Sequence, residues 1–261
     1  TKTLVEIFEG DNDISKEIIN SKKPLLILGE SFFKNDSANF LFNLIKKYLI
    51  DNSKISNQWN SINSLPTDAS TVGSLDLNII NDQINLFDEL KNNKFEMVYL
   101  LGQDSLNFTK KNEFIIYQGS HGDKGAEIAD IILPGATYTE QNGYFTNLEG
   151  KLQKAYKASY PPGEAKEDWQ IINELAEFMN NRKLFNDKDE LDSSMFNYIN
   201  LKKENNELMN LDTQTKENFK NESLKVDYKD YYFSNVVAKA SKKMLECHNA
   251  KLNIKLTGTY S

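Results

Sequence analysis

Short apolar runs alternate with stretches of helical periodicity through the first two thirds of the chain. The runs lie at residues 25–28, 95–101, 114–117 and 129–133, and a glycine or a proline closely follows each of them. A run without polar alternation is typical of a parallel strand that is covered on both faces. The pattern therefore predicts a mostly parallel β-sheet.

Apolar residues at three- and four-residue intervals predict amphipathic helices around these strands. The helices are expected at residues 37–50, 80–90, 164–180 and 231–247, with a shorter one after an entry segment within residues 1–20. A helix fragment with a long loop is expected at residues 51–74, and a further strand at 152–159. Strand, glycine and helix in succession indicate βαβ units, so we expect an α/β, Rossmann-like fold with a mostly parallel sheet flanked by helices.

The composition changes after residue 180. Asn, Lys, Asp and Glu dominate from Asn181 to Lys225, and such a segment buries too little apolar area to offset an ordering entropy of about 1–2 kcal/mol per residue. We expect an α/β domain over residues 1–180, a polar and partly irregular arm over 181–225, and a helix with a tail over 226–261. The arm and the helix are expected to dock on neighbouring subunits.

Composition and charge exclude several classes of protein. A net charge of −7 argues against a nucleic-acid partner, which would favour a basic face. No apolar segment reaches the roughly 20 residues that a membrane span requires. Arg182 is the single arginine, whereas Lys, Asn and Ile are abundant, which is typical of AT-rich organelle genomes. The first residues carry neither a signal-peptide core nor a basic presequence, so a targeting peptide is expected to be absent or already removed.

The single cysteine, Cys247, excludes an internal disulfide and any cysteine-ligated iron–sulfur cluster or zinc site made by this chain alone. A reducing compartment is expected. Cys247 and the adjacent His248 would leave a tetrahedral metal ion half coordinated, so we expect no metal site there.

The glycines concentrate between residues 114 and 151, which marks this stretch as the candidate site. Gly119, Gly122 and Gly125 follow a predicted strand at three-residue intervals, with His121 and Asp123 between them. The histidine and the aspartate suit a base and its orienting group, and the glycine amides suit a phosphate cradle. A simple tight turn explains the same residues, and neither a P-loop nor a Gly-x-Ser-x-Gly elbow is present.

Polar and glycine residues continue beyond the next predicted strand, which ends at Pro134-Gly135. In α/β proteins such residues lie at the carboxyl ends of strands, where ligands bind. Glu140 and Glu149 suit either an acid/base pair or bonds to loop amides. The rim formed in this way comprises Tyr138, Glu140, Asn142, Gly143, Asn147, Glu149 and Gly150.

Three segments of this stretch closely resemble one family. Residues 117–126 (YQGSHGDKGA), 128–140 (IADIILPGATYTE) and 147–153 (NLEGKLQ) are similar to the carboxyl-terminal half of the large, 75-kDa iron–sulfur subunits of NADH:ubiquinone oxidoreductase, respiratory complex I. The similarity continues through residues 161–172 (PPGEAKEDWQII) and is weaker elsewhere. It covers most of the chain except residues 181–225.

The resemblance implies a degenerate molybdopterin-oxidoreductase domain whose cofactor cleft is vestigial. The candidate cleft residues are Gly119, His121, Gly122, Asp123, Gly125, Glu140, Asn147, Glu149 and Lys151. Lys151 stands where the family commonly has arginine, so bidentate anion binding is lost. The resemblance also implies that the iron–sulfur clusters lie in a Cys-rich amino-terminal part, with no cofactor, catalytic residue or metal ligand in this chain.

The expected function is therefore structural: a non-catalytic carboxyl-terminal part of the large subunit, supporting electron transfer from NADH to ubiquinone in the matrix arm. Its expected partners are the Cys-rich part and other matrix-arm subunits, on the matrix side of the mitochondrial inner membrane. A split subunit is the favoured explanation for the separate Cys-rich part, and an amino-terminal half that this sequence does not include is the other. Two alternatives stay open. One is a molybdopterin-type oxidoreductase fragment that retains a nucleotide or pterin at residues 119–125, and the other is a hydrolase that uses His121.

Overall fold

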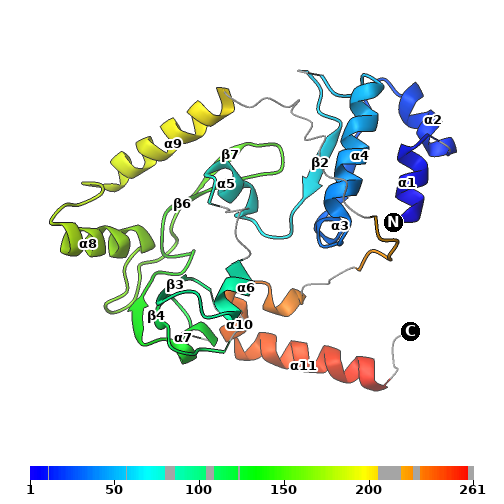
Figure 1. Cartoon of the computed structure of the whole chain (residues 1–261). Coiled ribbons are helices and arrows are strands. Elements are labelled where there is room, and N and C mark those ends of the chain that lie inside the picture. The colour runs from blue at the N-terminus through cyan, green and yellow to red at the C-terminus, as the bar shows by residue number, and fades with distance from the viewer. Residues whose placement is uncertain are drawn as a thin grey trace. The chain divides into compact units, whose positions relative to one another are not determined.

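The chain folds into two compact units in a computed structural model, whose elements are drawn in Figure 1. The described residues are 1–10, 12–56, 58–79, 86–103, 109–122, 124–204, 219–225 and 230–257. Unit 1 comprises residues 1–77, 146–152 and 198–228, and unit 2 comprises residues 78–145, 153–197 and 229–261. The domain boundaries expected at residues 180 and 225 stay a prediction.

Unit 1 is built around a short parallel sheet of two strands. Its elements are α1 (Lys2–Phe8), α2 (Asp13–Asn20), β1 (Leu26–Gly29), α3 (Glu30–Phe33), α4 (Ala38–Asp51), β2 (Ile62–Leu65) and α5 (Thr71–Asp76). Strands β1 and β2 run parallel, with Leu26 opposite Ile62 and Gly29 opposite Leu65. The strand and helix predicted at residues 25–28 and 37–50 are confirmed.

Strand β2 corrects the loop predicted for residues 51–74. Its sequence is Ile-Asn-Ser-Leu, and its last three residues are exposed. A strand with so little apolar character leaves no run to detect, because its stability comes from backbone pairing with β1 and not from its own side chains. Sequence periodicity therefore missed half of this sheet.

The core of unit 1 forms between α1, α4 and the sheet. Leu41, Ile45 and Leu49 of α4 are almost fully buried, and burying each such side chain contributes about 1.5–3 kcal/mol. Phe8 packs edge-on against Tyr48, with ring centroids 5.5 Å apart. The Tyr48 hydroxyl donates a hydrogen bond of 3.0 Å to the carbonyl of Ser15, which satisfies the polar tip within the core.

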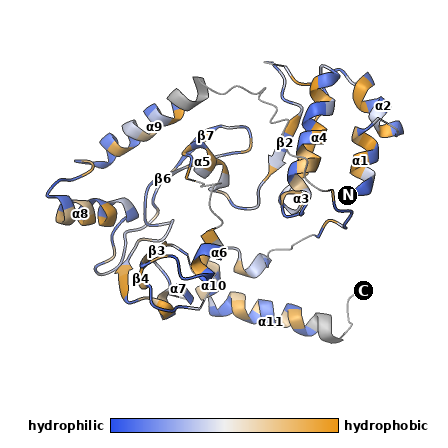
Figure 2. Ribbon diagram, viewed as in Figure 1, coloured by the Kyte–Doolittle hydropathy of each residue, from blue (hydrophilic) through white to orange (hydrophobic). Residues whose placement is uncertain are grey.

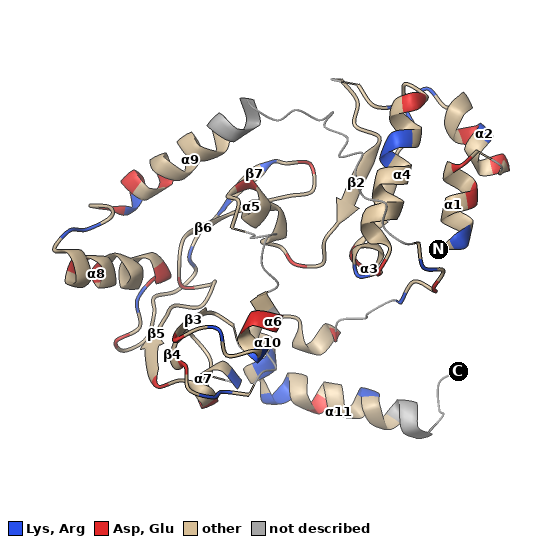
Figure 3. Cartoon of the chain, viewed as in Figure 1, with Lys and Arg blue, Asp and Glu red and all other residues tan. Residues whose placement is uncertain are grey.

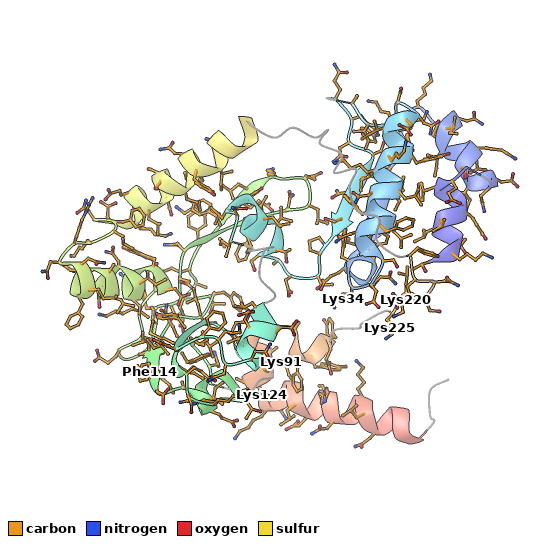
Figure 4. The ribbon with its side chains drawn as sticks, viewed as in Figure 1. Lys34, Lys91, Phe114, Lys124, Lys220 and Lys225 are labelled. Atoms are coloured by element: carbon orange, nitrogen blue, oxygen red, sulfur yellow. The ribbon has the colours of Figure 1, made fainter. Side chains whose placement is uncertain are left out.

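Residues 219–225 pack against the amino-terminal helices of unit 1. The amino group of Thr1 donates a hydrogen bond of 2.9 Å to the carbonyl of Glu222, and the Lys220 amide donates one of 2.9 Å to Ser37 Oγ. Phe219 packs on Phe40, with ring centroids 5.6 Å apart. This part of the arm, in which Lys220 is labelled in Figure 4, therefore contacts its own chain.

Unit 2 is organised around three parallel strands in the order β3-β4-β5, which confirms the α/β fold class. Val98 and Leu100 alternate with Tyr99 along β3, so one face of the sheet carries the core formed by Leu100, Ile115 and Tyr117. Helix α7 covers this face with Ala126 and Ile128. The strands and helices that lie in unit 2 are α6 (Leu86–Lys91), β3 (Met97–Leu101), β4 (Phe114–Gly119), α7 (Lys124–Ile128), β5 (Ile131–Pro134), α8 (Asp168–Asn180), η1 (Tyr231–Phe233), α10 (Val236–Ala240) and α11 (Lys242–Thr257).

Three further elements have residues in both units. They are β6 (Gly143–Thr146), β7 (Leu152–Ala155) and α9 (Lys188–Glu204). Strands β6 and β7 pair with each other in a separate two-stranded sheet. The strand predicted at residues 152–159 is thus present but shorter.

Helix α8 begins four residues later than predicted. Glu167 is its N-cap and forms a capping box with Gln170. The chain just before it is extended, because the Lys166 amide donates a hydrogen bond of 3.2 Å to the carbonyl of Pro134 and the Ala136 amide donates one of 2.8 Å back to Lys166. This bridge to the end of β5 keeps residues 164–167 out of the helix.

Helix α9 lies within the polar, partly irregular arm predicted for residues 181–225 and shows that part of it is regular. The Asp187 carboxylate accepts a hydrogen bond of 2.9 Å from the Glu190 amide at the start of the helix. Phe196 packs edge-on against Tyr144, with ring centroids 5.1 Å apart. A good cap and a few buried side chains stabilise this helix although it lacks a broad apolar stripe.

The helix predicted at residues 231–247 is divided. Ser241 has an extended backbone between α10 and α11, and its hydroxyl accepts a hydrogen bond of 3.4 Å from the Met244 amide. The predicted apolar residues at 80–85 and 226–228 lie outside the described residues.

Charges of both signs are interspersed along the helices in Figure 3. Among the described helices, none is long and apolar enough to cross a lipid bilayer.

Candidate functional site

The carboxyl ends of β3, β4 and β5 meet at one edge of the sheet, where the sequence predicts a ligand site. The Gly102 amide donates a hydrogen bond of 2.7 Å to Gln118, and the Gly135 amide donates one of 3.0 Å to Gly119. These bonds hold the segments that follow β3, β4 and β5 next to one another. In open α/β sheets this is the edge at which ligands bind.

The ring of Tyr117 fills the space beside the glycine loop. Tyr117 is 1% exposed, and its hydroxyl donates a hydrogen bond of 2.6 Å to the carbonyl of His121. A methyl group on Gly119 would lie 2.3 Å from the Tyr117 hydroxyl oxygen. A methyl group on Gly125 would lie 2.4 Å from the Gln103 carbonyl and 3.0 Å from the tyrosine ring. The glycines therefore make room for a side chain of this protein.

His121 lies next to this tyrosine but has only a local partner among the described side chains. Its Nδ1 atom lies 3.0 Å from the hydroxyl oxygen of Ser120, the preceding residue. Asp123, its predicted orienting group, lies outside the described residues, so the proposed base and orienter stay untested. Gly122 packs near Ala126, whose Cβ would lie 3.2 Å from a methyl group on the glycine.

A buried polar network occupies the opposite face of the same strand ends. Gln118 is fully buried, and its amide donates a hydrogen bond of 2.8 Å to the Asp168 carboxylate. Gln141 donates one of 3.0 Å to the other oxygen of Asp168. The Tyr99 hydroxyl donates a hydrogen bond to Gln118. The network ties the sheet, the loop after β5 and the first residue of α8 together.

Sequence reasoning did not identify this network as part of the site. Gln118 interrupts an apolar strand, and a polar residue in such a position must find buried partners. That signal was available, but the partners Gln141 and Asp168 lie 23 and 50 residues further along the chain. Only the tertiary structure brings them together.

The network also changes the local electrostatics. Burial raises the pKa of the Tyr99 phenol, and the nearby negative charge of Asp168 raises it further. The same carboxylate approaches Gly135, where an added methyl group would lie 2.8 Å from Asp168 Oδ1. An anionic ligand at this edge would therefore meet a fixed negative charge.

The predicted rim residues support their own loops. The Glu140 carboxylate accepts a hydrogen bond of 3.1 Å from the Thr137 amide, and Asn142 accepts one of 3.1 Å from the Lys157 amide. These are the loop-amide bonds expected as the alternative to acid/base chemistry.

Asn147 organises the turn between β6 and β7. Its side-chain oxygen accepts hydrogen bonds of 3.0 Å from the Glu149 amide and 2.9 Å from the Lys151 amide. Gly150 has a φ of +75°, a left-handed conformation that suits glycine. The side chains of Glu149 and Lys151 are exposed at this turn.

Asp130 of the Ala-Asp-x-x-Leu-Pro segment also has a structural role. Its carboxylate accepts a hydrogen bond of 2.8 Å from the Ile115 amide, at the start of β4. This bond and the neighbouring Lys110 ammonium group lower the pKa of Asp130 below its usual value. The aspartate fastens β5 to β4 at the end of the sheet opposite the glycine loop.

Two observations at this edge count against a pterin cofactor and its phosphate. The Tyr117 ring packs against Gly119 and Gly125, and the Asp168 carboxylate lies beside Gly135, where it would repel an anion. Within the described part of the chain, no group of three or more His, Cys, Asp or Glu side chains is arranged to hold a metal ion. What the arrangement does is pack three strand ends and two loops together.

Comparisons with known proteins found relatives that match almost the whole chain. The family model described as molybdopterin oxidoreductase matches residues 1–178. The NADH-ubiquinone oxidoreductase 75 kDa subunit of Reclinomonas americana is 34% identical over 261 residues, which cover 96% of this chain and 38% of the relative. One NADH-quinone oxidoreductase subunit of Rickettsia typhi is 36% identical over 264 residues, covering 96% of this chain and 37% of the relative.

A fungal protein shows the same relation. The mitochondrial NADH-ubiquinone oxidoreductase 78 kDa subunit of Neurospora crassa is 31% identical over 263 residues, covering 95% of this chain and 34% of the relative. The chain therefore spans less than two fifths of the length of these relatives. The similarity extends over residues 181–225, beyond the span that the sequence motifs indicated.

Proposed function

Since the chain belongs to the molybdopterin oxidoreductase family, we propose that it is a structural, non-catalytic, carboxyl-terminal part of the large subunit of NADH:ubiquinone oxidoreductase. Its relatives are named as subunits of that enzyme and match almost the whole chain. In this role it supports the transfer of electrons from NADH to ubiquinone without carrying them. It stands on the matrix side of the mitochondrial inner membrane.

The observation that carries the non-catalytic role is the filled glycine loop. The buried Tyr117 ring packs against Gly119 and Gly125, so a side chain of this protein fills the space beside both glycines. Gln118 and Asp168 bond to each other instead of presenting free groups to a ligand. A sheet edge that is filled by the protein's own side chains supports a structural role for the subunit.

The remaining part of the subunit supplies the electron carriers in this proposal. Cysteine thiolates are the usual ligands of iron–sulfur clusters, and this chain has one cysteine, which is exposed at Cys247. The clusters therefore belong to a Cys-rich amino-terminal part. Other subunits of the matrix arm complete the surroundings.

Purification of the complex from mitochondria of the source organism tests the assignment. The complex is solubilised in mild detergent, separated on a native gel and located by its NADH dehydrogenase activity. Mass spectrometry of the active band is expected to find peptides of this chain together with those of the Cys-rich part. A complex that is active and contains no peptide of this chain would contradict the assignment. A denaturing gel shows whether the two parts form one polypeptide or two.

Chemical analysis of the same sample separates the structural role from its alternative. Acid extraction followed by fluorescence detection of oxidised pterin, together with elemental analysis for molybdenum and tungsten, is expected to give values below stoichiometric levels. Iron at the level of the clusters is the internal control for intact complex. Stoichiometric pterin, or a nucleotide retained after desalting, would instead support an oxidoreductase fragment with a ligand at residues 119–125.

A further inference from the structure

One face of the β3-β4-β5 sheet is only partly covered in unit 2. Strand alternation and the parallel register place Met97, Phe114 and Ile131 on the face opposite Leu100 and Tyr117. Their side chains are 59%, 44% and 46% exposed. Met97 on β3 is the register partner of Phe114 on β4, so the two lie side by side on this face. Ile131 on β5 is the register partner of Ile116, two residues beyond Phe114. We call these three side chains the open sheet face.

The open sheet face lies toward the amino ends of the strands. At their carboxyl ends the central strand is covered on the same face, because Gln118 is fully buried and bonded to Asp168 at the start of α8, whereas Leu101 on the edge strand β3 is 48% exposed. The other face carries the buried core and α7, although Ile132 on the edge strand β5 is 54% exposed on that face. At the amino ends the uncovered area extends over all three strands. Phe114, the first residue of β4, is labelled in Figure 4, and Figure 2 shows the hydropathy of the strands around it.

An uncovered apolar face is unusual for a sheet of this kind. All-parallel sheets occur almost only with both faces covered, generally by helices. Covering these Met, Phe and Ile side chains would stabilise the protein by about 25 cal/mol for each Å² of apolar surface removed from water. Clustered exposed apolar residues of this kind mark interaction surfaces. A single amphipathic helix is the element that such a face accommodates.

The length of the relatives indicates where the covering element comes from. This chain corresponds to 38% or less of each relative that we compared, so more than three fifths of each relative lies outside the matched part. That polypeptide belongs to the same protein in the relatives, so it is available to pack against the matched part.

We propose that the open sheet face is the docking surface for an amphipathic helix from the part of the large subunit that lies outside these 261 residues. The inference rests on the proposed function, since it takes its occupant from the same subunit. Phe114 is the central anchor, with Met97 and Ile131 on either side. The covering helix completes the second layer of the α/β sandwich.

Site-specific photo-cross-linking in the assembled complex tests the proposal. Benzoylphenylalanine replaces Phe114 in the full chain, which is expressed in the source cells, and the complex is irradiated after purification. We expect cross-linked peptides from outside the 261 residues, within the Cys-rich remainder of the subunit. The matched control carries the same group at Tyr198 on α9, which has a similar exposure of 43%. The control is expected to give at least about tenfold less of that product.

Each other outcome has a defined meaning. Cross-links to unit 1 of the same chain, to a different subunit of the complex, or to nothing would overturn the proposal. A chain that does not enter the active complex at all would refute the proposed function, and that failure is seen in the native gel before irradiation. The two failures are therefore distinguishable.

A charged substitution gives an independent measurement. Phe114→Asp is expected to reduce recovery of the remainder of the subunit with the tagged chain about tenfold, because aromatic anchors at interface centres commonly contribute more than 1.4 kcal/mol. Ile14→Asp on α2, at a comparably exposed position, serves as the control and should leave recovery unchanged. Hydrogen exchange of the purified variant checks that β3 and β4 remain folded. Unchanged recovery with Phe114→Asp would overturn the proposal.

Discussion

Single residues around Tyr117 explain why glycines cluster after β4. Gly119 and Gly125 lie against the tyrosine ring or the adjacent backbone, where no side chain fits. The two glycines are therefore in close contact with the protein's own side chain and backbone. Glycines suit close packing against a side chain and a phosphate-binding loop equally well, because both need a backbone without Cβ atoms.

Gly119→Ala is expected to destabilise the protein by about 1–3 kcal/mol, because the new methyl group forces the buried Tyr117 ring out of its place. Urea denaturation followed by tyrosine fluorescence measures the change. Gly143→Ala is the control, since an added methyl group there meets nothing within 4 Å. Equal stability of the two variants would show that the loop has room for a ligand after all.

The Asp130 carboxylate makes folding depend on pH. Its pKa is lowered in the folded protein, chiefly by the Ile115 amide and also by Lys110. The stabilisation is therefore present above the unfolded-state pKa of about 4 and is lost as pH falls through the lower folded-state value. We expect Asp130→Asn to lower the Tm at pH 7 and to have progressively less effect below about pH 4.

Thermal denaturation of both proteins between about pH 3 and pH 7 measures this difference. Glu164→Gln, in an exposed segment, controls for the loss of one negative charge. A difference in Tm that stays constant over the whole pH range would mean that the ionised form of Asp130 is not what stabilises the strand.

At the scale of elements, α9 shows how a polar sequence becomes a helix. Capping at Asp187 and the ion pair of 2.8 Å between Lys188 and Asp192 stabilise its first turns. Phe196 adds the contact with Tyr144. Composition alone could not reveal this, since a few favourable local interactions are hidden in a stretch of polar residues.

Phe196→Ala is expected to cost about 1–3 kcal/mol and to loosen α9, because the helix loses its aromatic contact with Tyr144. Hydrogen exchange detected by mass spectrometry should show faster exchange of the α9 amides. Asn197→Ala, at the exposed neighbouring position, should leave the exchange unchanged. Faster exchange in both variants, to the same extent, would indicate that α9 is held by local helix propensity alone.

At the scale of the whole molecule, distant segments are joined within each unit. Residues 219–225 lie against the first residues of the chain and the start of α4, with sequence separations of 183 to 221 residues. Part of the predicted docking arm thus completes unit 1. The rest of its predicted role, contact with neighbouring subunits, stays a prediction.

A double substitution of Phe219 and Lys220 by alanine is expected to expose the start of α4. It removes the ring contact with Phe40 and the ion pair of 2.8 Å with Asp36. Hydrogen exchange in α1 and in the first turn of α4 should become at least about tenfold faster, which corresponds to about 1.4 kcal/mol. Ser223→Ala, at an exposed position of the same segment, is the control. Unchanged exchange would mean that this segment does not stabilise unit 1.

The sequence by itself determined the α/β class, the positions of β1, β3, β4 and β5, and the family. Apolar runs and glycine stops are local properties, and motifs such as residues 128–140 are read without knowing the fold. Only the tertiary structure showed how the residues of the candidate site pack. Tyr117 lies against glycines two and eight residues away, and Gln118 meets Asp168, 50 residues away. It likewise decided which face of the sheet is open, because an apolar residue reads the same in the sequence whether its face is covered or not.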